Sequence, residues 1–424
     1  MKIREYKNIG ETLASETLQN GLTVHVLRKP SYNKAFAYFA TNYGGADRRF
    51  RLDGNWIDTP AGVAHFLEHK MFDTPDGGNA LAVMSANGAS PNAYTSAGIT
   101  AYHFECTDNF EDNLRVLLSF VSVPHFTPES VEKEQGIIGQ EIRMMEDSPG
   151  YVVYYSLMRS LYTHNPLRDS VAGTVESIAE ITDTTLYDCH KVFYNPSNMV
   201  LCVVGDVDPE RVVELAREQL SGDAGIVPER DYGGDEPELP SEKYAEAVME
   251  VSSPLFVFGS RLTPAAPGEG RLRQKLVSNL ALECLLGRSS PFYTSQYSAG
   301  LINDNFGFEV DYVAGTAMTL VEGESSNPQK VLDEVLAAAK RAGQEGLDAQ
   351  LFDRIKKASY GDRLRSLGSF GAICRSLADG RFTGYAPLDS FEMLAAIEKE
   401  EAEAFITEAF DSSRIAMSVV RSQS

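Results

Sequence analysis

The residues best suited to chemistry lie between positions 62 and 72, in the sequence Gly-Val-Ala-His-Phe-Leu-Glu-His-Lys-Met-Phe. If this segment is helical, His65, Glu68 and His69 stand at i, i+3 and i+4 and share one face. Two imidazoles one turn apart can bind one zinc ion, and a carboxylate beside them can take a proton from a zinc-bound water. The order His-x-x-Glu-His is the inverse of the usual zinc-protease motif. The alternative is two surface histidines paired with a glutamate on a soluble helix.

Local signals predict where this helix begins and what holds it. Thr59 is a candidate N-cap, and Pro60 suits a first helical position because proline lacks the N–H that would be unbonded there. The apolar residues between the histidines indicate that one face of the helix lies in a core.

A second helix carries further candidate ligands. Thr127 and Pro128 predict its start, and it is expected to run to about residue 145. Glu134 and Glu141 lie seven residues apart, so they share one face of it. The residues alone leave two alternatives open. The glutamates face solvent, as charged helix faces usually do, or they face the histidines and supply a ligand.

The first half of the chain alternates between strands and helices. An Asn20-Gly21 turn between apolar residues predicts a hairpin. Strands are expected at residues 23–27, 35–43, 92–96, 100–104 and 199–204. Helices are expected at residues 80–86, 111–121, 151–161, 177–193 and 212–220.

The second half repeats this pattern. Residues 193–204 and 409–420 each place a polar turn before a buried strand, 216 positions apart. Strands are expected within residues 245–262 and 306–320, and helices at 272–286, 330–342 and 348–367. This indicates an internal duplication of one α+β unit.

The two copies differ in their chemistry, since all seven histidines lie at or before His190. A histidine-based metal site can therefore lie only in the first half. Residues 221–242 are rich in Gly, Pro, Asp and Glu and are typical of a linker. We expect a zinc-binding catalytic domain at 1–222, a linker at 223–243 and a homologous domain without a metal site at 244–424.

Composition excludes some classes of function. The 424 residues carry a net charge of −22, which repels phosphate backbones and argues against a nucleic-acid partner. The five cysteines form no Cys-x-x-Cys pair, which favours a reducing compartment without disulfides. The first residues show no signal-peptide pattern, and no apolar stretch is long enough to span a bilayer. We expect a cytoplasmic protein with no membrane partner.

At this point the motifs resemble the pitrilysin/insulinase-type zinc peptidases, which include the mitochondrial processing peptidase. In that family His-x-x-Glu-His is followed about seventy residues later by a glutamate ligand, and Glu141 follows His69 by 72. A glutamate seven residues earlier, here Glu134, also fits. So do the segments Asn-Ala-Tyr-Thr at 92–95 and Tyr-Asn-Pro-Ser-Asn-Met at 194–199. The resemblance covers nearly the whole chain.

The resemblance implies a fold and a set of roles. The fold would be α+β, with two homologous α/β sandwich domains, each an antiparallel-rich sheet packed with helices, that form a clamshell. One zinc ion per chain would be bound by His65, His69 and Glu141. Glu68 would be the general base, and Glu134 would act behind the ligands. An extended peptide would pair with an edge strand that contains Asn92, Ala93 and Tyr94.

One segment departs from the family pattern. Active members carry an Arg and a Tyr in the second domain that contact substrate, and here Tyr297 and Asn303 occupy the matching positions of residues 289–303. We therefore expect either a homodimer or a heterodimer with a homologous chain that lacks the zinc motif and supplies the missing contacts.

The predicted function is that of a zinc-dependent metalloendopeptidase, a hydrolase that cleaves extended or unfolded peptides. In the expected reaction, zinc-bound water is activated by Glu68. The alternative is a non-catalytic or partner-dependent scaffold subunit of the same fold. A third reading, an S-ribosylhomocysteinase-like lyase, shares the His-x-x-Glu-His motif, but the duplicated length and the helix with Glu134 and Glu141 argue against it.

Overall fold

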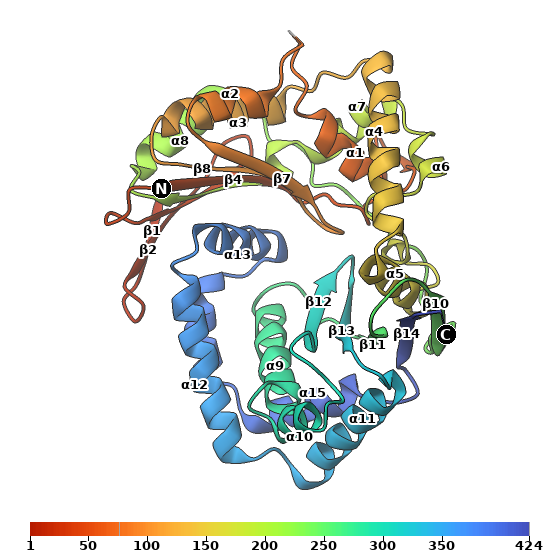
Figure 1. Ribbon diagram of the computed structural model, residues 1–424. Coiled ribbons are helices and arrows are strands. Elements are labelled where there is room, and N and C mark those ends of the chain that lie inside the picture. Colours follow the sequence, from red (N-terminus) through yellow and green to blue (C-terminus); the bar gives the residue numbers. More distant parts are fainter. Residues whose placement is uncertain (76, 424) are drawn as a thin grey trace. The chain divides into compact units, whose positions relative to one another are not determined.

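The computed structural model describes residues 1–75 and 77–423, which fold into two compact units (Figure 1). The first unit consists of Met1–Ile142, Ser170–Tyr232 and Leu364–Pro387. The second consists of Arg143–Asp169, Gly233–Arg363 and the chain from Leu388 onward. Each unit is built around its own β-sheet, which confirms the predicted α+β class.

The sheet of the first unit has seven strands in the order β1-β2-β3-β9-β4-β8-β7. β3 and β9 are parallel, and every other neighbouring pair is antiparallel. β4 and β9 are buried along their whole length, so the core lies at the centre of this sheet. The strands are β1 (Lys2–Tyr6), β2 (Glu11–Thr17), β3 (Thr23–Arg28), β4 (Ala35–Thr41), β7 (Ser90–Thr95), β8 (Thr100–Cys106) and β9 (Met199–Gly205).

The predicted hairpin joins β2 and β3. Leu18 and Leu22 close it through a backbone hydrogen bond of 2.8 Å. Gly21 has a φ of +88°, and a Cβ there would lie 2.2 Å from Oγ of Ser197. Only glycine fits this position, because the turn needs a left-handed residue and a second loop passes against it.

Helices lie on both faces of the first sheet. α2, α3 and α8 cover one face, and α13 packs against β9 and β4 on the other (Figure 1). Among its described residues, the helices of this unit are α1 (Val63–Lys70), α2 (Ala80–Ala86), α3 (Phe110–Ser122), α4 (Pro128–Glu146, in this unit up to Ile142), α6 (Val175–Ile178), α7 (Asp183–Phe193), α8 (Pro209–Gln219) and α13 (Phe370–Thr383).

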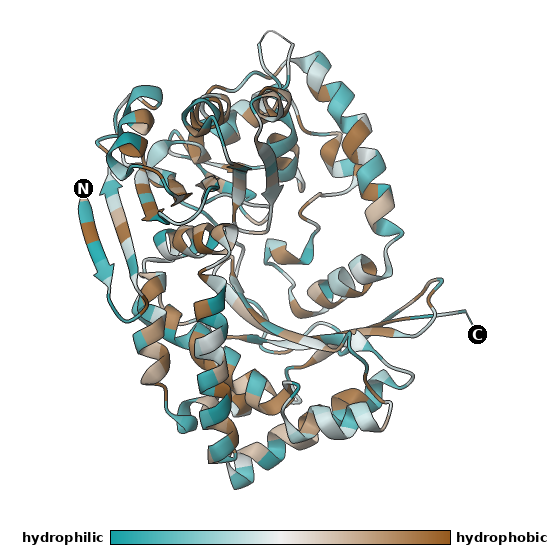
Figure 2. Cartoon of the chain, turned by 60° about the vertical axis from the view of Figure 1, so that its left-hand side comes forward, coloured by the Kyte–Doolittle hydropathy of each residue, from teal (hydrophilic) through white to brown (hydrophobic). Residues whose placement is uncertain are grey.

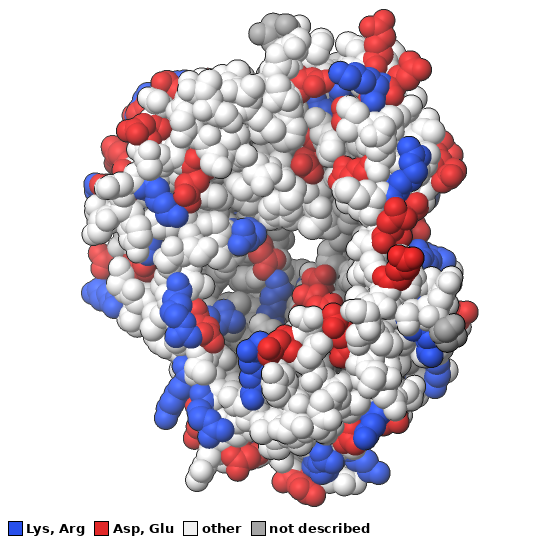
Figure 3. Space-filling view, viewed as in Figure 1, with Lys and Arg blue, Asp and Glu red and all other residues white. Residues whose placement is uncertain are grey.

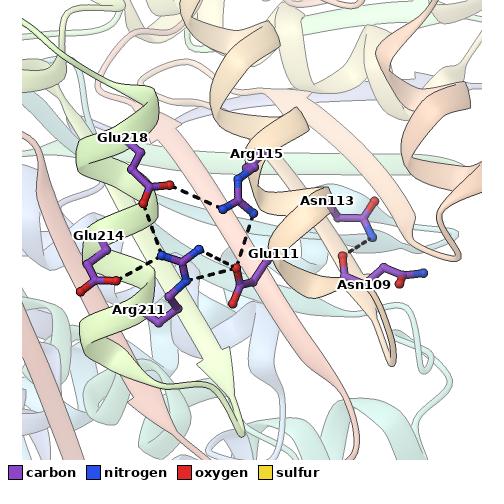
Figure 4. Close-up of polar contacts among 7 residues, drawn as sticks. All are labelled: Asn109, Glu111, Asn113, Arg115, Arg211, Glu214 and Glu218. Carbon is purple, nitrogen blue, oxygen red and sulfur yellow. Dashed lines mark hydrogen bonds and ion pairs between the residues drawn. The ribbon is translucent and has the colours of Figure 1, made fainter.

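An ion-pair network joins α3 to α8 on the surface (Figure 4). Arg211 of α8 contacts Glu111 of α3 at 2.9 Å, and Arg115 of α3 lies 3.5 Å from Glu218 of α8. These side chains are a third or more exposed, so each pair contributes little to stability, on the order of 0–1 kcal/mol. The buried apolar faces of the two helices hold them in place instead.

The sheet of the second unit has five strands in the order β10-β14-β11-β13-β12. β10 and β14 are parallel and the other pairs are antiparallel, which is the pattern of β3, β9, β4, β8 and β7. The predicted internal duplication is therefore visible in the topology. The strands are β10 (Tyr244–Val248), β11 (Leu255–Leu262), β12 (Gly307–Val313), β13 (Thr316–Glu324) and β14 (Ala416–Arg421).

Helices of the second unit pack against its own sheet, as helices of the first unit do. α5 packs against β10, β11 and β14, while α9 contacts β12, α11 and α15 contact β11, and these three helices contact one another. The helices are α5 (Pro149–Leu161), α9 (Glu269–Leu286), α10 (Pro291–Ser298), α11 (Pro328–Glu345), α12 (Ala349–Ser366, in this unit up to Arg363), α14 (Ser390–Ala395) and α15 (Lys399–Ala409).

The compact units differ from the contiguous domains expected at 1–222 and 244–424. α5 comes from the first half of the chain and packs on the second sheet, whereas α13 comes from the second half and packs on the first. The apolar faces of these helices were visible in the sequence, but a pattern of apolar residues does not identify the sheet that buries it. Residues 221–242 form no helix and only one isolated β-bridge, at Arg230.

Two local predictions also need correction. The helix expected at residues 177–193 is divided, because Thr182 caps a new helix at Asp183. An unexpected hairpin of β5 (Arg49–Leu52) and β6 (Asn55–Asp58) turns at Asp53 and Gly54, which have φ values of +49° and +85°. An Asp-Gly pair is a strong signal for such a turn.

Surface and core properties follow from the composition. Most helices in Figure 2 carry both hydrophobic and hydrophilic residues, as expected of helices with one face in a core. Acidic and basic side chains are interspersed on the face shown in Figure 3.

The five cysteines are free and buried. Among the described residues, no helix has the length and apolar character needed to cross a membrane.

Candidate metal centre and active site

Helix α1 places both histidines, and it starts later than the sequence indicated. The helix begins at Val63, and Gly62 before it has a φ of +94°. Thr59 does not cap it, because its Oγ1 donates instead to the carbonyl of Arg48 at 2.9 Å. A Cβ at Gly62 would lie 2.5 Å from the carbonyl oxygen of Ala172, so the helix start is set by close contact with that loop. The prediction of a cap at Thr59 and Pro60 was wrong.

The core face of α1 fixes the direction of the histidines. Val63, Phe66 and Leu67 are buried. His65 and His69 lie one turn apart, and their ring centroids are 4.6 Å apart. Their side chains are 12% and 26% exposed, so both imidazoles lie at the edge of the core and are not free on a solvated surface.

Helix α4 brings a carboxylate to the two imidazoles. Thr127 caps this helix as predicted, because its Oγ1 accepts the N–H of Ser130 at 3.2 Å. Glu141 lies with Oε1 3.6 Å from Nε2 of His65 and Oε2 3.6 Å from Nε2 of His69. One ligand atom from each of the three residues lies within 4.8 Å of the others. Of the two alternatives, the glutamate therefore faces the histidines.

The spacing of these atoms fits a shared metal ion better than hydrogen bonds. Nitrogen and oxygen ligands lie about 2.0–2.2 Å from zinc, so tetrahedral ligands are separated by about 3.4 Å. A hydrogen bond from an imidazole N–H to a carboxylate would be about 2.7–3.2 Å long. The two separations of 3.6 Å are close to the first distance, and two imidazoles with one carboxylate form a typical set of zinc ligands.

Glu134 contacts the ring nitrogen of His69 that faces away from Glu141. Its Oε1 is 3.1 Å from Nδ1 of His69, so the ring can donate to it and direct Nε2 towards Glu141. Burial raises the pKa of Glu134, but the hydrogen bond and charge of His69 and the charge of Lys70 outweigh this, and the net pKa is lowered. Glu134 and Glu141 therefore approach opposite nitrogens of the same imidazole.

The two histidines differ in their tendency to take up a proton. Burial, followed by the charge of His69, lowers the pKa of His65 to about 4. Burial also lowers the pKa of His69, but its hydrogen bond to Glu134 and the charges of the three nearby glutamates give a net increase in pKa. Metal ligation needs the neutral imidazole, which His65 provides at neutral pH.

Glu68 lies on the same helix face and is only 7% exposed. Its Oε2 accepts a hydrogen bond of 2.8 Å from Oγ1 of Thr95. Burial raises the pKa of Glu68, and the hydrogen bond from Thr95 opposes this without cancelling it. A carboxylate with a raised pKa is a better proton acceptor at neutral pH than an exposed one.

The strand that carries Thr95 also carries the expected substrate segment. β7 is the last strand of the first sheet and pairs with β8 alone among the described strands, so its other edge is open. Asn92, Ala93 and Tyr94 are all partly exposed. The hydroxyl of Tyr94 lies 2.6 Å from that of Tyr38, which fixes the ring on one face of the sheet.

Two further residues at this site were not recognised from the sequence. Thr95 binds Glu68, and Lys70 is a buried cation beside Glu134. Nothing local indicates the role of Thr95, because its contact depends on how β7 packs against α1. The sequence does indicate that Lys70 is paired, since a lysine within a buried apolar helix must have a partner, but it does not identify that partner.

The departures at Tyr297 and Asn303 belong to the second unit. Tyr297 lies in the last turn of α10, is 46% exposed and stacks on Tyr293 with ring centroids 5.6 Å apart. The side-chain amide of Asn303 donates to Glu324 at 3.1 Å. Both side chains are therefore held by their own unit.

Comparisons with known proteins agree with the geometry. The family model of insulinase, peptidase family M16, matches residues 54–175, and that of the M16 inactive domain matches residues 180–359. The chain is 38% identical over 410 residues to YmfH of Bacillus subtilis, described as an uncharacterized zinc protease. The match covers 93% of this chain and 92% of that relative.

Solved structures give the same result. An M16-like peptidase from Alicyclobacillus acidocaldarius superposes with a TM-score of 0.93 and 32% identity, over 97% of this chain and 99% of that one. A protease from Helicobacter pylori has the same fold, with a TM-score of 0.82 at 19% identity over 96% and 99% of the two chains. The resemblance seen in the sequence motifs is thus confirmed, and the chain belongs to peptidase family M16, the insulinase family.

Proposed function

We propose that this chain is a zinc-dependent endopeptidase that cleaves extended or unfolded peptides, with Glu68 as the general base. The observation that carries this proposal is the convergence of His65, His69 and Glu141 on one point. Glu68 is buried on the same helix face, one residue before the second histidine. The proposal includes one zinc ion per chain.

The chain's own residues supply the proton chemistry. A zinc ion held by three protein ligands supplies a Lewis acid with one open coordination position. Glu68 would accept the proton of the attacking water and return it to the departing amine. The hydroxyl of Thr95 holds one oxygen of Glu68, which leaves the other oxygen for this transfer.

The open edge of β7 supports a preference for extended substrates. A peptide added to this edge would form main-chain hydrogen bonds that do not depend on its sequence. Asn92, Ala93 and Tyr94 lie on this strand, which ends at Thr95 and so leads directly to Glu68. A folded protein pairs or protects most of its extended segments, so unfolded chains are the expected substrates.

A second candidate is a scaffold, or a peptidase that needs a partner. Tyr297 and Asn303 stand where active relatives were expected to carry an arginine and a tyrosine. In this case the chain would bind zinc but cleave peptides only with a homologous partner, or not at all. The five free, buried cysteines support a reducing, cytoplasmic setting for either candidate.

The test measures bound metal and peptide hydrolysis together. Zinc content and turnover of a mixed peptide library are measured for the wild type and Glu141→Gln, with Glu132→Gln as the control on an exposed position of the same helix. We expect one zinc ion per wild-type chain, a sharp loss in Glu141→Gln and no change in Glu132→Gln.

The activity measurement then separates the two candidates. Cleavage by the isolated wild type would identify a self-sufficient peptidase. Zinc binding without cleavage would favour the partner-dependent or scaffold role. A wild-type protein prepared with zinc that retains none would refute the metal site.

A further inference from the structure

Lys70 follows the second histidine of the motif and is almost completely buried, at 2% exposure. It forms an ion pair with Asp73, and its Nζ lies 3.8 Å from Oε2 of Glu134. A buried ammonium group is stable only when it is paired, because removing it from water costs several kcal/mol. Asp73 is partly exposed, so Glu134 is the buried partner of Lys70.

The carboxylate of Glu134 is thereby held from two sides. Oε1 accepts from Nδ1 of His69 at 3.1 Å, and Oε2 faces Lys70. Asp73 in turn binds Lys70 just beyond the end of α1. The three residues form a charged chain that runs from the surface to the ring of His69.

We propose that Lys70 is a positioning residue for the metal site, which holds Glu134 against His69 and so directs Nε2 of His69 towards Glu141. The inference rests on the proposed zinc site and adds a residue to it. Lys70 touches none of the three ligand atoms, so its effect on metal binding passes through Glu134. Groups that orient a ligating histidine typically change metal affinity by about 10-fold to 100-fold.

The direction in which zinc affinity changes when Lys70 is replaced separates a positioning role from a simple charge effect. A lysine near a metal site repels the cation, so removing its charge should strengthen zinc binding if charge alone matters. Removing a positioning residue should weaken it, because Glu134 is then free to leave His69. A purely structural lysine would change stability and leave the zinc affinity of the folded protein unchanged.

The experiment measures zinc affinity by competition with a chromophoric chelator, using the full chain loaded with zinc. We expect Lys70→Met to weaken zinc binding by about 10-fold or more. Glu134→Gln should weaken it as well, and the double variant should be no worse than Glu134→Gln alone, because both changes break one route. Lys191→Met is the control, since Lys191 forms an exposed ion pair with Asp53 on the surface.

Each result has a definite meaning. Unchanged or tighter zinc binding in folded Lys70→Met overturns the inference, and so do fully additive losses in the double variant. If Lys70→Met does not fold, Lys70→Met/Asp73→Asn removes both charges of the outer pair and the same result is expected. A wild type that binds no zinc refutes the metal site itself, whereas normal wild-type binding with unaffected variants refutes only the role of Lys70.

Discussion

The two sheets of this protein have the same topology, but only one carries a candidate active site. The strands β3, β9, β4, β8 and β7 correspond in order and direction to β10, β14, β11, β13 and β12. In the first unit the helix after β4 carries His65, Glu68 and His69, whereas the helix after β11 carries no histidine. The shared fold thus provides positions, and the residues at those positions decide whether there is chemistry.

The edge strands β7 and β12 show that the two sheets can differ at a single residue that matters for the candidate site. In the first sheet Tyr94 pairs with Ala101, and in the second Tyr312 pairs with Ala317. One position later, Thr95 pairs with Thr100 in the first sheet, whereas the second sheet has Val313 opposite Thr316. The residue that binds Glu68 is therefore the one that differs between these matched pairs.

The largest expected effect is that of Glu68→Gln. The variant keeps the three ligand atoms but loses the proton acceptor, so we expect zinc to remain bound and turnover to fall by about 10²–10⁴-fold. His69→Ala should lose both zinc and activity. Peptide hydrolysis and metal content, measured on the same preparations, distinguish the two variants.

The control for this prediction comes from the second copy. Glu283 lies at an exposed position of α9, the helix that follows β11, and partial desolvation raises its pKa. Glu283→Gln is the same chemical change on the corresponding helix, and it should leave both zinc content and turnover unchanged. Turnover at the wild-type rate in Glu68→Gln would show that Glu68 is not the general base.

The comparison also predicts which unit fails first in acid. His25 and His190 lie in the first unit, and burial lowers the pKa of each to about 4 from an ordinary value of 6.5. The unfolded chain therefore binds protons that the folded unit excludes, and stability falls as the pH drops from about 6.5 to 4. At about 1.4 kcal/mol per pKa unit, each histidine accounts for at most about 3.5 kcal/mol.

Hydrogen exchange can test this prediction on each sheet separately. Between pH 7 and pH 4.5, protection should be lost in β3 and β9 before β11 and β14. The measurement uses zinc-free protein, so that release of zinc in acid does not add to the effect. His190→Gln removes one titrating group and should flatten the acid slope of the first unit alone. Earlier loss of protection in the second sheet would contradict the assignment.

The sequence predicted much of the fold, because strands and helices with a clear apolar face have a local signature. Helix α4 begins where Thr127 and Pro128 indicated, and the duplication was recognisable from two matching turn-strand segments. The exchange of α5 and α13 was not predictable, since an apolar face shows that a helix is buried but not which sheet buries it.

The candidate site likewise contains features that the sequence predicted and features that depend on tertiary packing. The spacing of His65, Glu68 and His69 on one helix is a local property and was predicted from the residues. The direction of Glu141 depends on how α4 packs against α1, so the residues alone left it open and only the family resemblance assigned it. The contacts of Thr95 and Lys70 are tertiary, and no pattern in the sequence signalled that they would meet Glu68 and Glu134.

The smallest effect tests the single difference between the edge strands. Thr95→Val gives the first sheet the residue that the second sheet has, and it removes the hydrogen bond to Glu68 while nearly preserving the shape of the side chain. A hydrogen bond to a charged group contributes about 1.5–3 kcal/mol, so we expect kcat to fall by about 10-fold to 150-fold. Zinc content should not change, because Thr95 contacts no ligand.

Two further variants make this result specific. Thr95→Ser restores a hydroxyl and should recover most of the activity, whereas Val313→Thr adds a hydroxyl to the second sheet and should have no effect. A loss of zinc in Thr95→Val as large as the loss of activity would show that the threonine supports the whole helix and not the base. If kcat is unchanged, the difference between the two edge strands is incidental, and the contrast between the two copies reduces to the metal ligands and Glu68.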